Sequence, residues 1–559
     1  MLAKIGCLVL LTQVICCSQE PSLYFGKTTP LHDTDELWIN NSAEPEWIDP
    51  GKCSDATGSE VIWNLFSGLT QAHPKTLEPM PDLAKRWTVS SDQTVYTFYL
   101  RDSVWSDGTP LTAHDFVWSW KRVLHPKTAA KYASMLFVIK NAEAYNKDPS
   151  QDQVGITALD DHTLEVTLVG PIPYFLNLTN HYTFFPVPKH VLQKLESASR
   201  NSDLWTRPEY IVTNGPYVLK KWQFRQEALF EKNRLYWDSP NIKTPRIRLL
   251  MIESYTTSLN LYRTSDVDYN NRNTTIPAEF MAYMKQYLDY QNDPELAVYF
   301  YWLNVKKPPL DRPKVRQALS LAIDRQSLVD NVTRGGQIAY ANLVPRGLAG
   351  YDGLKTALFE LTRARQLLKE AGFPEGKNFP TTTLIYNTSE GHKIIAEAIQ
   401  EMWKKNLGIN VIIENQEWKV YLKNLQMKNF QISRMGWVGD YPDPYSFLEL
   451  LSEHSGNNHS LWSNHRYDEL LEQSHRSLDK QQRLNLLLEA EQMLVAAQPL
   501  IPLYIYAKSH TLKPYMRGYL SNFQDRHPWK YLWIDMERAK NPPTQFQEDE
   551  PPAMIPFAD

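Results

Sequence analysis

The sequence is poor in cysteine, carries no excess of charge of one sign and has no long hydrophobic run beyond its N-terminus. Lys and Arg number 59 and Asp and Glu 63, so the formal net charge is −4 over 559 residues. A protein that binds the phosphates of a nucleic acid needs a basic face, and a chain with nearly equal numbers of basic and acidic residues does not indicate one. A bilayer-spanning helix needs about 20 apolar residues, and no later segment approaches that length. These absences argue against a nucleic-acid binder and against a protein embedded in the membrane.

The signatures of exported hydrolases are also missing. The chain has no HExxH zinc motif, no GxSxG nucleophile motif and no CxxC pair. The segment from Asp440 to Asp443 lacks the ligand ladder and the glycine of an EF-hand loop. The spacing of acidic residues in the sequence does not exclude a glycosidase, which needs only two carboxylates at a set distance in the folded protein. An exported hydrolase therefore stays open as one alternative, and we expect no metal or other cofactor.

The N-terminus has the pattern of an export signal. Lys4 precedes an apolar run from Ile5 to Ile15, which is too short to span a bilayer but has the length of a signal h-region. The following letters VICC resemble the lipobox of bacterial lipoproteins, which implies cleavage after residues 1–16 and acylation of Cys17. A plain signal peptide cut nearby is the alternative. Cleavage before Cys17 leaves Cys53 as the one free thiol, so a disulfide framework is excluded.

Length and periodicity indicate several lobes. A chain of 559 residues exceeds what one hydrophobic core supports, so we expect two or three lobes. Period-two patterns predict strands at 95–100, 162–170 and 297–305. Helical spacing follows Pro313, and a second helix should end at Gly408. Strand and helix alternate most regularly over 297–510, which predicts an α/β lobe, whereas the acidic, proline-rich segment 541–559 is predicted to be a disordered tail.

Eight segments, in this order along the chain, resemble the oligopeptide-binding proteins of bacterial ABC importers. Any one of them would be weak, but together they extend over nearly the whole chain after the signal. They are 105–134, 158–168, 211–222, 259–269, 313–325, 384–393, 404–419 and 434–448.

The resemblance implies an α/β type II periplasmic-binding-protein (Venus flytrap) fold, in which an extra domain makes three domains in two lobes around a ligand cleft. After a linker at 17–26, domain I would be discontinuous, domain II continuous, and domain III would follow a hinge crossing near 296 and end at another near 509. The implied ranges are 27–66, 190–295 and 510–540 for domain I, 67–189 for domain II and 296–509 for domain III.

The same resemblance implies a function. A protein of this kind captures a short peptide in the periplasm and delivers it to the transmembrane subunits of an ABC permease, whose ATPase subunits hydrolyse ATP. We expect a monomer that performs no catalysis and is tethered to a membrane through an N-terminal lipid. Relatives with this fold that bind another ligand remain the alternative: a thiol-containing peptide such as glutathione, a murein peptide, a nickel complex or a sugar.

A peptide ligand carries an ammonium, a carboxylate and a row of backbone donors and acceptors, each costly to desolvate without a partner. A receptor tolerant of sequence should therefore bind the backbone by strand-like hydrogen bonds. Residues 435–438, which include Gly436 and Val438, could offer such an edge. Asp440 would then either pair with the ligand ammonium, as the resemblance implies, or cap a local turn. Asp443, between two prolines, is expected to stabilise the turn.

The resemblance supplies further candidates on both sides of the cleft. Arg434 is either a ligand contact or an ion-pair partner of Asp440, and Trp437 is either a cavity wall or core. The segment that runs antiparallel to the bound peptide matches Ser54, Asp55, Ala56 and Thr57.

Three aromatic or imidazole side chains also match positions near the ligand. Tyr132 matches a tyrosine that faces the peptide. His181 and His392 fall near the cleft, although a lone histidine is more often structural.

Three positions depart from the family pattern. Trp302 stands where these proteins carry an acid near the side-chain pockets, and Leu425 where they tend to carry a basic residue. Both changes predict a more apolar cavity wall. Cys53 replaces an aliphatic residue beside the presumed peptide-binding strand, where it is either a small buried hydrophobe or a thiol near the ligand.

Overall fold

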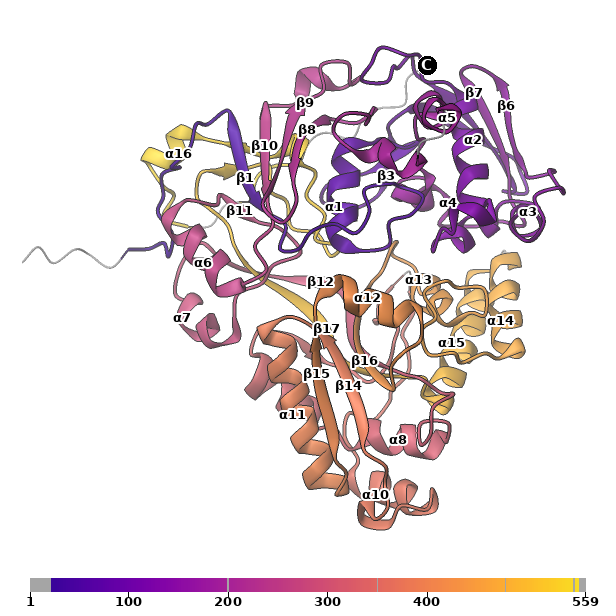
Figure 1. Cartoon of the computed structure of the whole chain (residues 1–559), viewed down its shortest axis with the longest axis vertical. Helices are drawn as coiled ribbons and strands as arrows, with labels where there is room; N and C mark the ends of the chain where they lie inside the picture. Colours follow the sequence, from indigo (N-terminus) through magenta and orange to yellow (C-terminus); the bar gives the residue numbers. More distant parts are fainter. Residues whose placement is uncertain (1–21, 199–200, 349, 478, 546–547, 552–559) are drawn as a thin grey trace, which may run out of the picture.

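The computed structural model describes residues 22–198, 201–348, 350–477, 479–545 and 548–551. The predicted signal peptide and Cys17 lie outside the described residues. The chain forms two lobes (Figure 1): the N-terminal half and the C-terminal segment build the upper one, and the intervening segment builds the lower one.

The upper lobe contains a five-stranded sheet assembled from segments far apart in the sequence. Its order is β11-β1-β10-β9-β8, with β1 parallel to both of its neighbours and the other pairs antiparallel. The strands are β1 Glu36–Asn40, β8 Tyr217–Gln223, β9 Glu227–Lys232, β10 Arg246–Leu250 and β11 Tyr269–Asn270.

A second, antiparallel sheet in the upper lobe has the order β4-β5-β7-β6. Its strands are β4 Ala84–Val89, β5 Val95–Leu100, β6 Ile156–Asp160 and β7 Thr163–Thr167, so two predicted strands are confirmed. The main helices of the upper lobe are α1 Ala56–Leu65, α2 Ala113–Leu124 and α5 Lys189–Ser197. One hydrophobic core includes both Leu37 of β1 and Phe98 of β5, which makes the two sheets parts of a single lobe.

The lower lobe is built on a six-stranded sheet with helices on both faces. Its order is β13-β17-β12-β16-β14-β15. The strands are β12 Tyr290–Leu303, β13 Ile338–Ala339, β14 Thr382–Asn387, β15 Val411–Gln416, β16 Ile432–Val438 and β17 Leu500–Thr511. The main helices are α8 Pro313–Leu321, α10 Leu361–Glu370, α11 Glu390–Leu407, α12 Trp418–Gln426, α14 His465–Arg476 and α15 Lys480–Ala497. As predicted, Pro313 opens α8 and Gly408 ends α11 in the left-handed conformation, with a φ of 70°.

Strands β12 and β17 form the connection between the lobes. Tyr290, at the start of β12, pairs with Thr511 at the end of β17, while Trp302 pairs with Leu500 deep in the lower lobe. In Figure 1 the two strands run from the lower sheet up to the other lobe. A pair of strands that alone crosses a boundary can bend there, so the hinge near 296 and 509 stays our prediction.

Part of the C-terminal segment departs from the expectation of a disordered tail. After α16 Met536–Lys540, Glu548 lies 2.7 Å from Lys75, and Asp549 accepts hydrogen bonds from Arg517 and from the N–H of Gly518. The two carboxylates thus fix this stretch to basic and backbone donors of the upper lobe.

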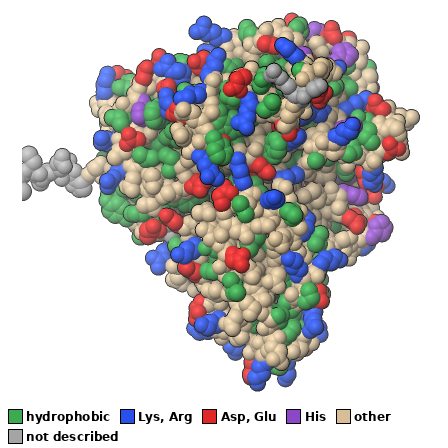
Figure 2. All heavy atoms as spheres, viewed as in Figure 1, with side chains coloured by type: hydrophobic (Ala, Val, Ile, Leu, Met, Phe, Trp, Pro, Cys, Tyr) green, Lys and Arg blue, Asp and Glu red, His purple; other side chains and the backbone are tan. Residues whose placement is uncertain are grey.

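The surface shows no region dominated by charge of one sign on the face in Figure 2, where Lys and Arg alternate with Asp and Glu. Within the described ranges, no helix is both long and apolar enough to cross a membrane. The same ranges contain no group of three or more His, Cys, Asp or Glu side chains arranged to hold a metal ion.

Candidate functional site

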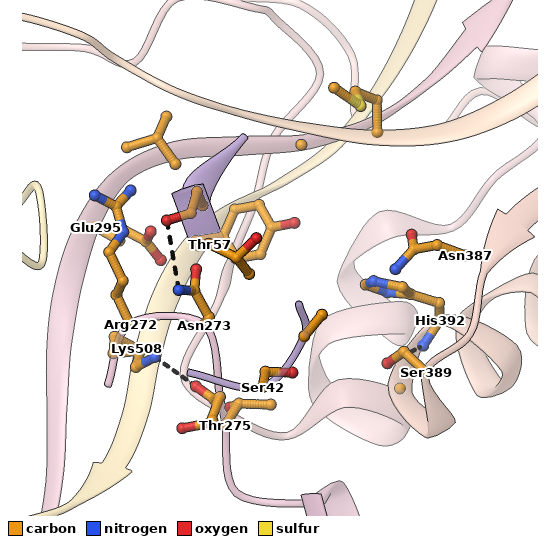
Figure 3. A pocket seen from close by; sticks show the side chains of 18 of the residues that line it. Ser42, Thr57, Arg272, Asn273, Thr275, Glu295, Asn387, Ser389, His392 and Lys508 are labelled. Atoms are coloured by element: carbon orange, nitrogen blue, oxygen red, sulfur yellow. Dashed lines mark hydrogen bonds between the residues drawn. The ribbon is translucent and has the colours of Figure 1, made fainter. Parts of the chain in front are cut away.

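A cavity of about 420 Å³ lies between the two lobes, within the size range of small-molecule sites. Figure 3 shows residues of the upper lobe facing the start of α11, which belongs to the lower lobe. Every predicted ligand-binding residue except Trp302 lines it: Ser54, Asp55, Ala56, Thr57, Tyr132, His181, His392, Arg434, Gly436, Trp437, Val438 and Asp440.

The predicted backbone edge is present on β16. This strand pairs with β12 over its whole length but with β14 only at Ile432 and Ser433, so the edge beyond Ser433 has no neighbouring strand. The N–H of Gly439 donates to the C=O of Leu296 in β12 at 2.8 Å. Because backbone groups alternate between the two edges of a strand, those of Val438 and Gly436 point away from β12, towards the unpaired edge.

Gly436 allows an aromatic ring to approach this strand. A Cβ atom at Gly436 would lie 2.6 Å from the Tyr506 hydroxyl, which no real side chain tolerates without displacement. The same hydroxyl accepts a hydrogen bond from Nη2 of Arg434 at 2.6 Å. The absence of a side chain at Gly436 thus helps to position Arg434.

Asp440 is held through its backbone, which leaves its carboxylate available. Its N–H donates to Oγ of Ser446 at 2.8 Å, and its C=O accepts from the Gln524 amide at 2.9 Å. Among the described residues, no backbone N–H donates to the carboxylate, so the turn-capping alternative does not hold. The carboxylate contacts Nε2 of His181 at 3.4 Å. Since Nδ1 of His181 accepts from the N–H of Thr183, Nε2 is the nitrogen that carries the proton towards Asp440.

Asp443 has the structural role predicted for it. It accepts from the N–H of Tyr445 at 2.9 Å and forms a two-pronged, buried ion pair with Arg483 of α15 at 2.8 and 2.9 Å. The two acids of this segment therefore have different functions: Asp443 shapes the segment, and Asp440 faces the cavity.

The guanidinium of Arg434 has no carboxylate partner among the described residues. Its partners are Tyr506, the Asn387 side chain at 3.4 Å and the ring of Tyr299, 4.6 Å from Cζ. Nε is buried without an acceptor, and no described acid pairs with it, so the proposed ion pair with Asp440 is wrong. An enclosed cation that lacks an anion is costly, which makes Arg434 a candidate for binding an anionic ligand group.

His392 lies at the first turn of α11, close to Arg434. Its Nδ1 is 3.3 Å from the Tyr299 hydroxyl. Burial, together with the positive charge of Arg434, lowers the pKa of His392 well below its ordinary value. The imidazole is therefore neutral at physiological pH and can serve as a hydrogen-bonding group.

The upper wall offers main chain rather than free side chains. The Asp55 carboxylate caps α1 by accepting from the N–H of Gly58 at 2.9 Å and from the Thr57 hydroxyl, and burial raises its pKa. Cys53 is 2% exposed and is not among the lining residues. Burial and the nearby Asp55 raise its thiol pKa well above the ordinary value, so Cys53 is the small buried hydrophobe.

Aromatic contacts join the lobes beside the cavity. The ring of Tyr132 lies 5.2 Å from that of His181 and 6.4 Å from that of Trp437 in the opposite lobe. Trp437 is a wall residue that is anchored by its Nε1, which donates to the C=O of Ser446 at 2.8 Å. A second contact, absent from the sequence reasoning, places Tyr174 on Tyr441 as a stacked pair with centroids 4.5 Å apart.

Trp302 was expected at the cavity and is not there. It is fully buried, with its ring 5.0 Å from Phe300 and 6.2 Å from His459. Side chains alternate along β12, which puts Trp302 and Phe300 on the face covered by α15. Leu425 belongs to the same core, so neither departure changes the cavity wall.

The sequence reasoning missed several charged residues that line the cavity. Arg272, Glu295 and Lys508 come from the loop after β11, from β12 and from β17. No motif surrounds them, and the crossing of the lobes brings them together. No local signal could have found them.

Known proteins resemble this chain over most of its length. Residues 78–459 match the family model described as bacterial extracellular solute-binding proteins, family 5 Middle. The periplasmic oligopeptide-binding protein OppA of Salmonella typhimurium is 37% identical over 525 residues, which cover 91% of this chain and 94% of that protein. The structure of Haemophilus influenzae OppA in complex with RPPGFSPFR matches with a TM-score of 0.85 and 32% identity, over 90% of this chain and 99% of that one. The unliganded open form of the murein tripeptide-binding protein MppA matches with a TM-score of only 0.62, at 33% identity over 91% and 98% of the two chains.

Proposed function

The chain belongs to the bacterial extracellular solute-binding proteins of family 5, and we propose that it captures short peptides between its lobes and delivers them to a membrane permease. It is an oligopeptide-binding component of an ABC transporter and not an enzyme, and it acts in the periplasm or outside the cell. Its mixed α/β fold is the one predicted.

The observation that carries the proposal is the unpaired edge of β16 between two groups of opposite charge. Val438 and Gly436 offer backbone donors and acceptors. Among the described residues, the Asp440 carboxylate, beyond one end of this edge, is contacted by His181 alone, and Arg434, at the other end, pairs with no anion. An extended peptide has the matching sequence of groups, with an ammonium, a backbone and a carboxylate. We infer that the amino end faces Asp440 and the carboxyl end faces Arg434 and His392.

The lobes are closed around the cavity, which supports capture by enclosure. The structure is closer to a peptide complex than to an open, unliganded relative, as the two TM-scores show. Direct contacts hold the closed arrangement, including the ion pair of Arg225 with Glu417 at 3.6 Å and the hydrogen bond from Thr256 to Glu390 at 3.2 Å. We propose that opening occurs by bending of β12 and β17.

The delivery step and the membrane tether rest on the family and the N-terminal pattern. We propose that the partner is an ABC permease with its ATPase subunits and that Cys17 carries the lipid. No nucleic acid is involved, and the protein acts as a monomer.

Native mass spectrometry of the purified protein tests the proposal. We expect co-purified short peptides, which are lost after unfolding and refolding and regained on incubation with a peptide mixture. A co-purified oligosaccharide or metal complex, with no peptide rebinding, would overturn it. Cleavage of the bound peptide that disappears in Asp440→Asn would instead favour the hydrolase alternative.

A further inference from the structure

An aromatic cluster lies on the upper lobe where the described chain begins. Its members are Phe25, near the start of the chain, Tyr283 of α7 Met281–Met284, and Tyr287 shortly after that helix. The ring of Phe25 packs edge-on against both tyrosines, with ring centroids 6.3 Å and 5.7 Å apart, and the two tyrosine hydroxyls are hydrogen-bonded to each other. Figure 1 shows the first described residues on the same edge of the upper lobe as α7. The cluster therefore fixes the beginning of the chain to this helix.

Part of the cluster and its neighbour Leu23 are exposed. Leu23 is 53% exposed and Tyr283 is 51% exposed, whereas Phe25 and Tyr287 are half-buried. We call these four residues the aromatic surface. A single exposed leucine needs no explanation, but apolar side chains that gather at one place mark a contact. Tyrosine combines an apolar ring with a hydroxyl and is enriched where a membrane meets water.

Three basic residues belong to the segments that carry the aromatic surface. Lys27 and Lys285 each come two residues after a ring of this surface, and the N–H of Lys27 donates to the C=O of Arg263 at 3.0 Å. All three basic residues are exposed, and none of them forms an ion pair with an acid of the described ranges. The same edge of the upper lobe thus presents positive charge next to apolar groups.

The acids on the same segments are engaged or lie elsewhere. Asp289 is buried and accepts from two backbone N–H groups near the start of the chain, each at 2.9 Å. The Asp266 carboxylate accepts from the hydroxyl of Thr264, and Glu279 is one of the residues that line the cavity between the lobes. Apolar groups flanked by exposed lysine and arginine are typical of a surface that binds an anionic membrane.

The proposed lipid anchor lies close to this surface along the chain. Cys17 precedes the first described residue, Ser22, by five positions, and five residues extend no more than about 18 Å. A globular chain of 559 residues has a radius of gyration of about 24 Å. Because the tether is shorter than this radius, it keeps the edge of the protein where the chain begins next to the bilayer.

We propose that the aromatic surface and its three basic neighbours rest on the anionic phospholipid bilayer that anchors the lipid of Cys17. The inference rests on the tether in the proposed function and is independent of the ligand. The side chains of Leu23 and Tyr283 enter the interface between headgroups and acyl chains, and the basic side chains pair with lipid phosphates. The contact involves the upper lobe alone, so the lower lobe stays free to move when the lobes open.

Hydroxyl-radical footprinting measures the contact at single side chains. Lipidated protein on vesicles of phosphatidylcholine and phosphatidylglycerol is compared with unlipidated Cys17→Ser in solution. Burial in the interface should slow the oxidation of Leu23 and Tyr283 about threefold or more. Ile412 and Val420 of the lower lobe, which are 50% and 52% exposed, should keep their rates. Unchanged rates at Leu23 and Tyr283 would overturn the proposal.

A variant with both Lys27→Gln and Lys285→Gln separates the surface from the tether. It keeps the lipid but loses two positive charges, so on the mixed vesicles at least about half of the slowing should disappear, as it should for the parent on phosphatidylcholine alone. The matched control is Lys369→Gln with Lys423→Gln, two exposed lysines of the lower lobe, which should keep the slowing. Equal slowing in both double variants and on both lipids would mean that the tether alone holds this edge at the membrane, and the proposal would be wrong.

Two further measurements keep this test separate from that of the proposed function. Mass spectrometry of the mature protein shows whether Cys17 is acylated, and an unmodified Cys17 would overturn the inference while leaving peptide capture untouched. Calorimetry should give the same peptide affinity for the parent and for both double variants, which also establishes that they are folded. Absence of peptide binding in the parent would count against the proposed function and not against the membrane contact.

Discussion

The Tyr174 hydroxyl of the upper lobe lies 2.6 Å from Nε2 of His475 in the lower lobe. The ring of Tyr174 stacks on Tyr441 with an interplanar angle of 10° and also packs against Tyr445, and the guanidinium of Arg483 lies 5.6 Å from it. A side chain of one lobe thus occupies an aromatic socket in the other. The socket belongs to the segment that presents Asp440, so lobe closure and the ligand site share one structural support.

Weakening this contact should favour the open form. Tyr174→Phe keeps the ring but removes a hydrogen bond of about 1 kcal/mol, which predicts roughly fivefold weaker peptide binding. Tyr174→Ala empties the socket and should weaken binding further and enlarge the ligand-free protein in small-angle X-ray scattering. Tyr217→Phe, which removes a buried hydroxyl that donates to the C=O of Thr244 within the upper lobe, is the control. Unchanged affinity in Tyr174→Ala would show that the contact does not bias closure.

Asp440→Asn should discriminate between peptides by their amino end. Asn keeps an oxygen for His181 but loses the negative charge, and a charge-assisted hydrogen bond contributes about 1.5 to 3 kcal/mol. We expect free-amino peptides to bind about 10- to 100-fold more weakly, while N-acetylated peptides change little. Calorimetry measures both. Equal losses for the two peptide types would refute the ammonium role.

Arg434→Gln should act at the opposite end of the ligand. The variant removes a guanidinium that pairs with no anion among the described residues, so peptides with a free carboxylate should lose about 10- to 100-fold in affinity. Peptides with a C-terminal amide never made this charge pair and serve as the internal comparison. If amidated peptides lose as much, Arg434 acts by supporting the strand and not by binding the carboxylate.

Asp443→Asn should reduce stability more than selectivity. It leaves Arg483 buried without its anion, which typically costs about 3 to 5 kcal/mol in the free energy of unfolding. The double variant Asp443→Leu with Arg483→Met replaces the pair by apolar groups and should recover part of that loss. Denaturant unfolding gives the comparison. A single variant as stable as the parent would mean that the ion pair contributes nothing.

Because Glu449 is buried, the stability of the protein should depend on pH in a direction that can be stated. Burial and the nearby Asp440 raise its pKa from 4.5 to about 7, against the effect of its hydrogen bond from Ser134. Between these two values the folded state holds a proton that the unfolded state releases, so this group's stabilising contribution falls as the pH rises from about 4.5 to about 7. Glu449→Gln should remove that component.

Burial lowers the pKa of His475 to about 3, and its contribution has the opposite sign: it is present above the unfolded pKa of 6.5 and lost as the pH falls. The difference between parent and Glu449→Gln curves is therefore the quantity to measure. Identical slopes over this window would contradict the prediction.

The sequence was sufficient to predict those site residues whose role depends on their neighbours in the same segment. The strand edge at Gly436 and the separate roles of Asp440 and Asp443 depend on residues close together in the sequence. The motifs that match the family in order along the chain placed Ser54 and Tyr132 at the same cavity. The prediction that Trp302 lines the cavity was wrong. Whether a residue of β12 faces the cavity or the core depends on which face of the sheet its side chain is on and on the packing of α15, and a matching position in a family does not record either.

The remaining features depend on contacts between distant segments. Tyr174 meets Tyr441 across 267 positions of sequence, and only closure of the lobes makes it a contact. Arg272 and Glu295 lie on different elements and have no motif around them. Hydrophobic periodicity carries no information about such pairs, because contacts between segments that are distant in the sequence bring the two residues to one cavity.

The tyrosine socket has a kinetic consequence. Since both lobes wall the cavity, a bound peptide can leave only after Tyr174 withdraws from the lower lobe. The slowest step of release is then a property of the protein, and chemically different peptides should share an upper limit on their dissociation rates. Residence time would be set by how often the lobes part, and a permease that pulls them apart would control unloading without recognising the cargo.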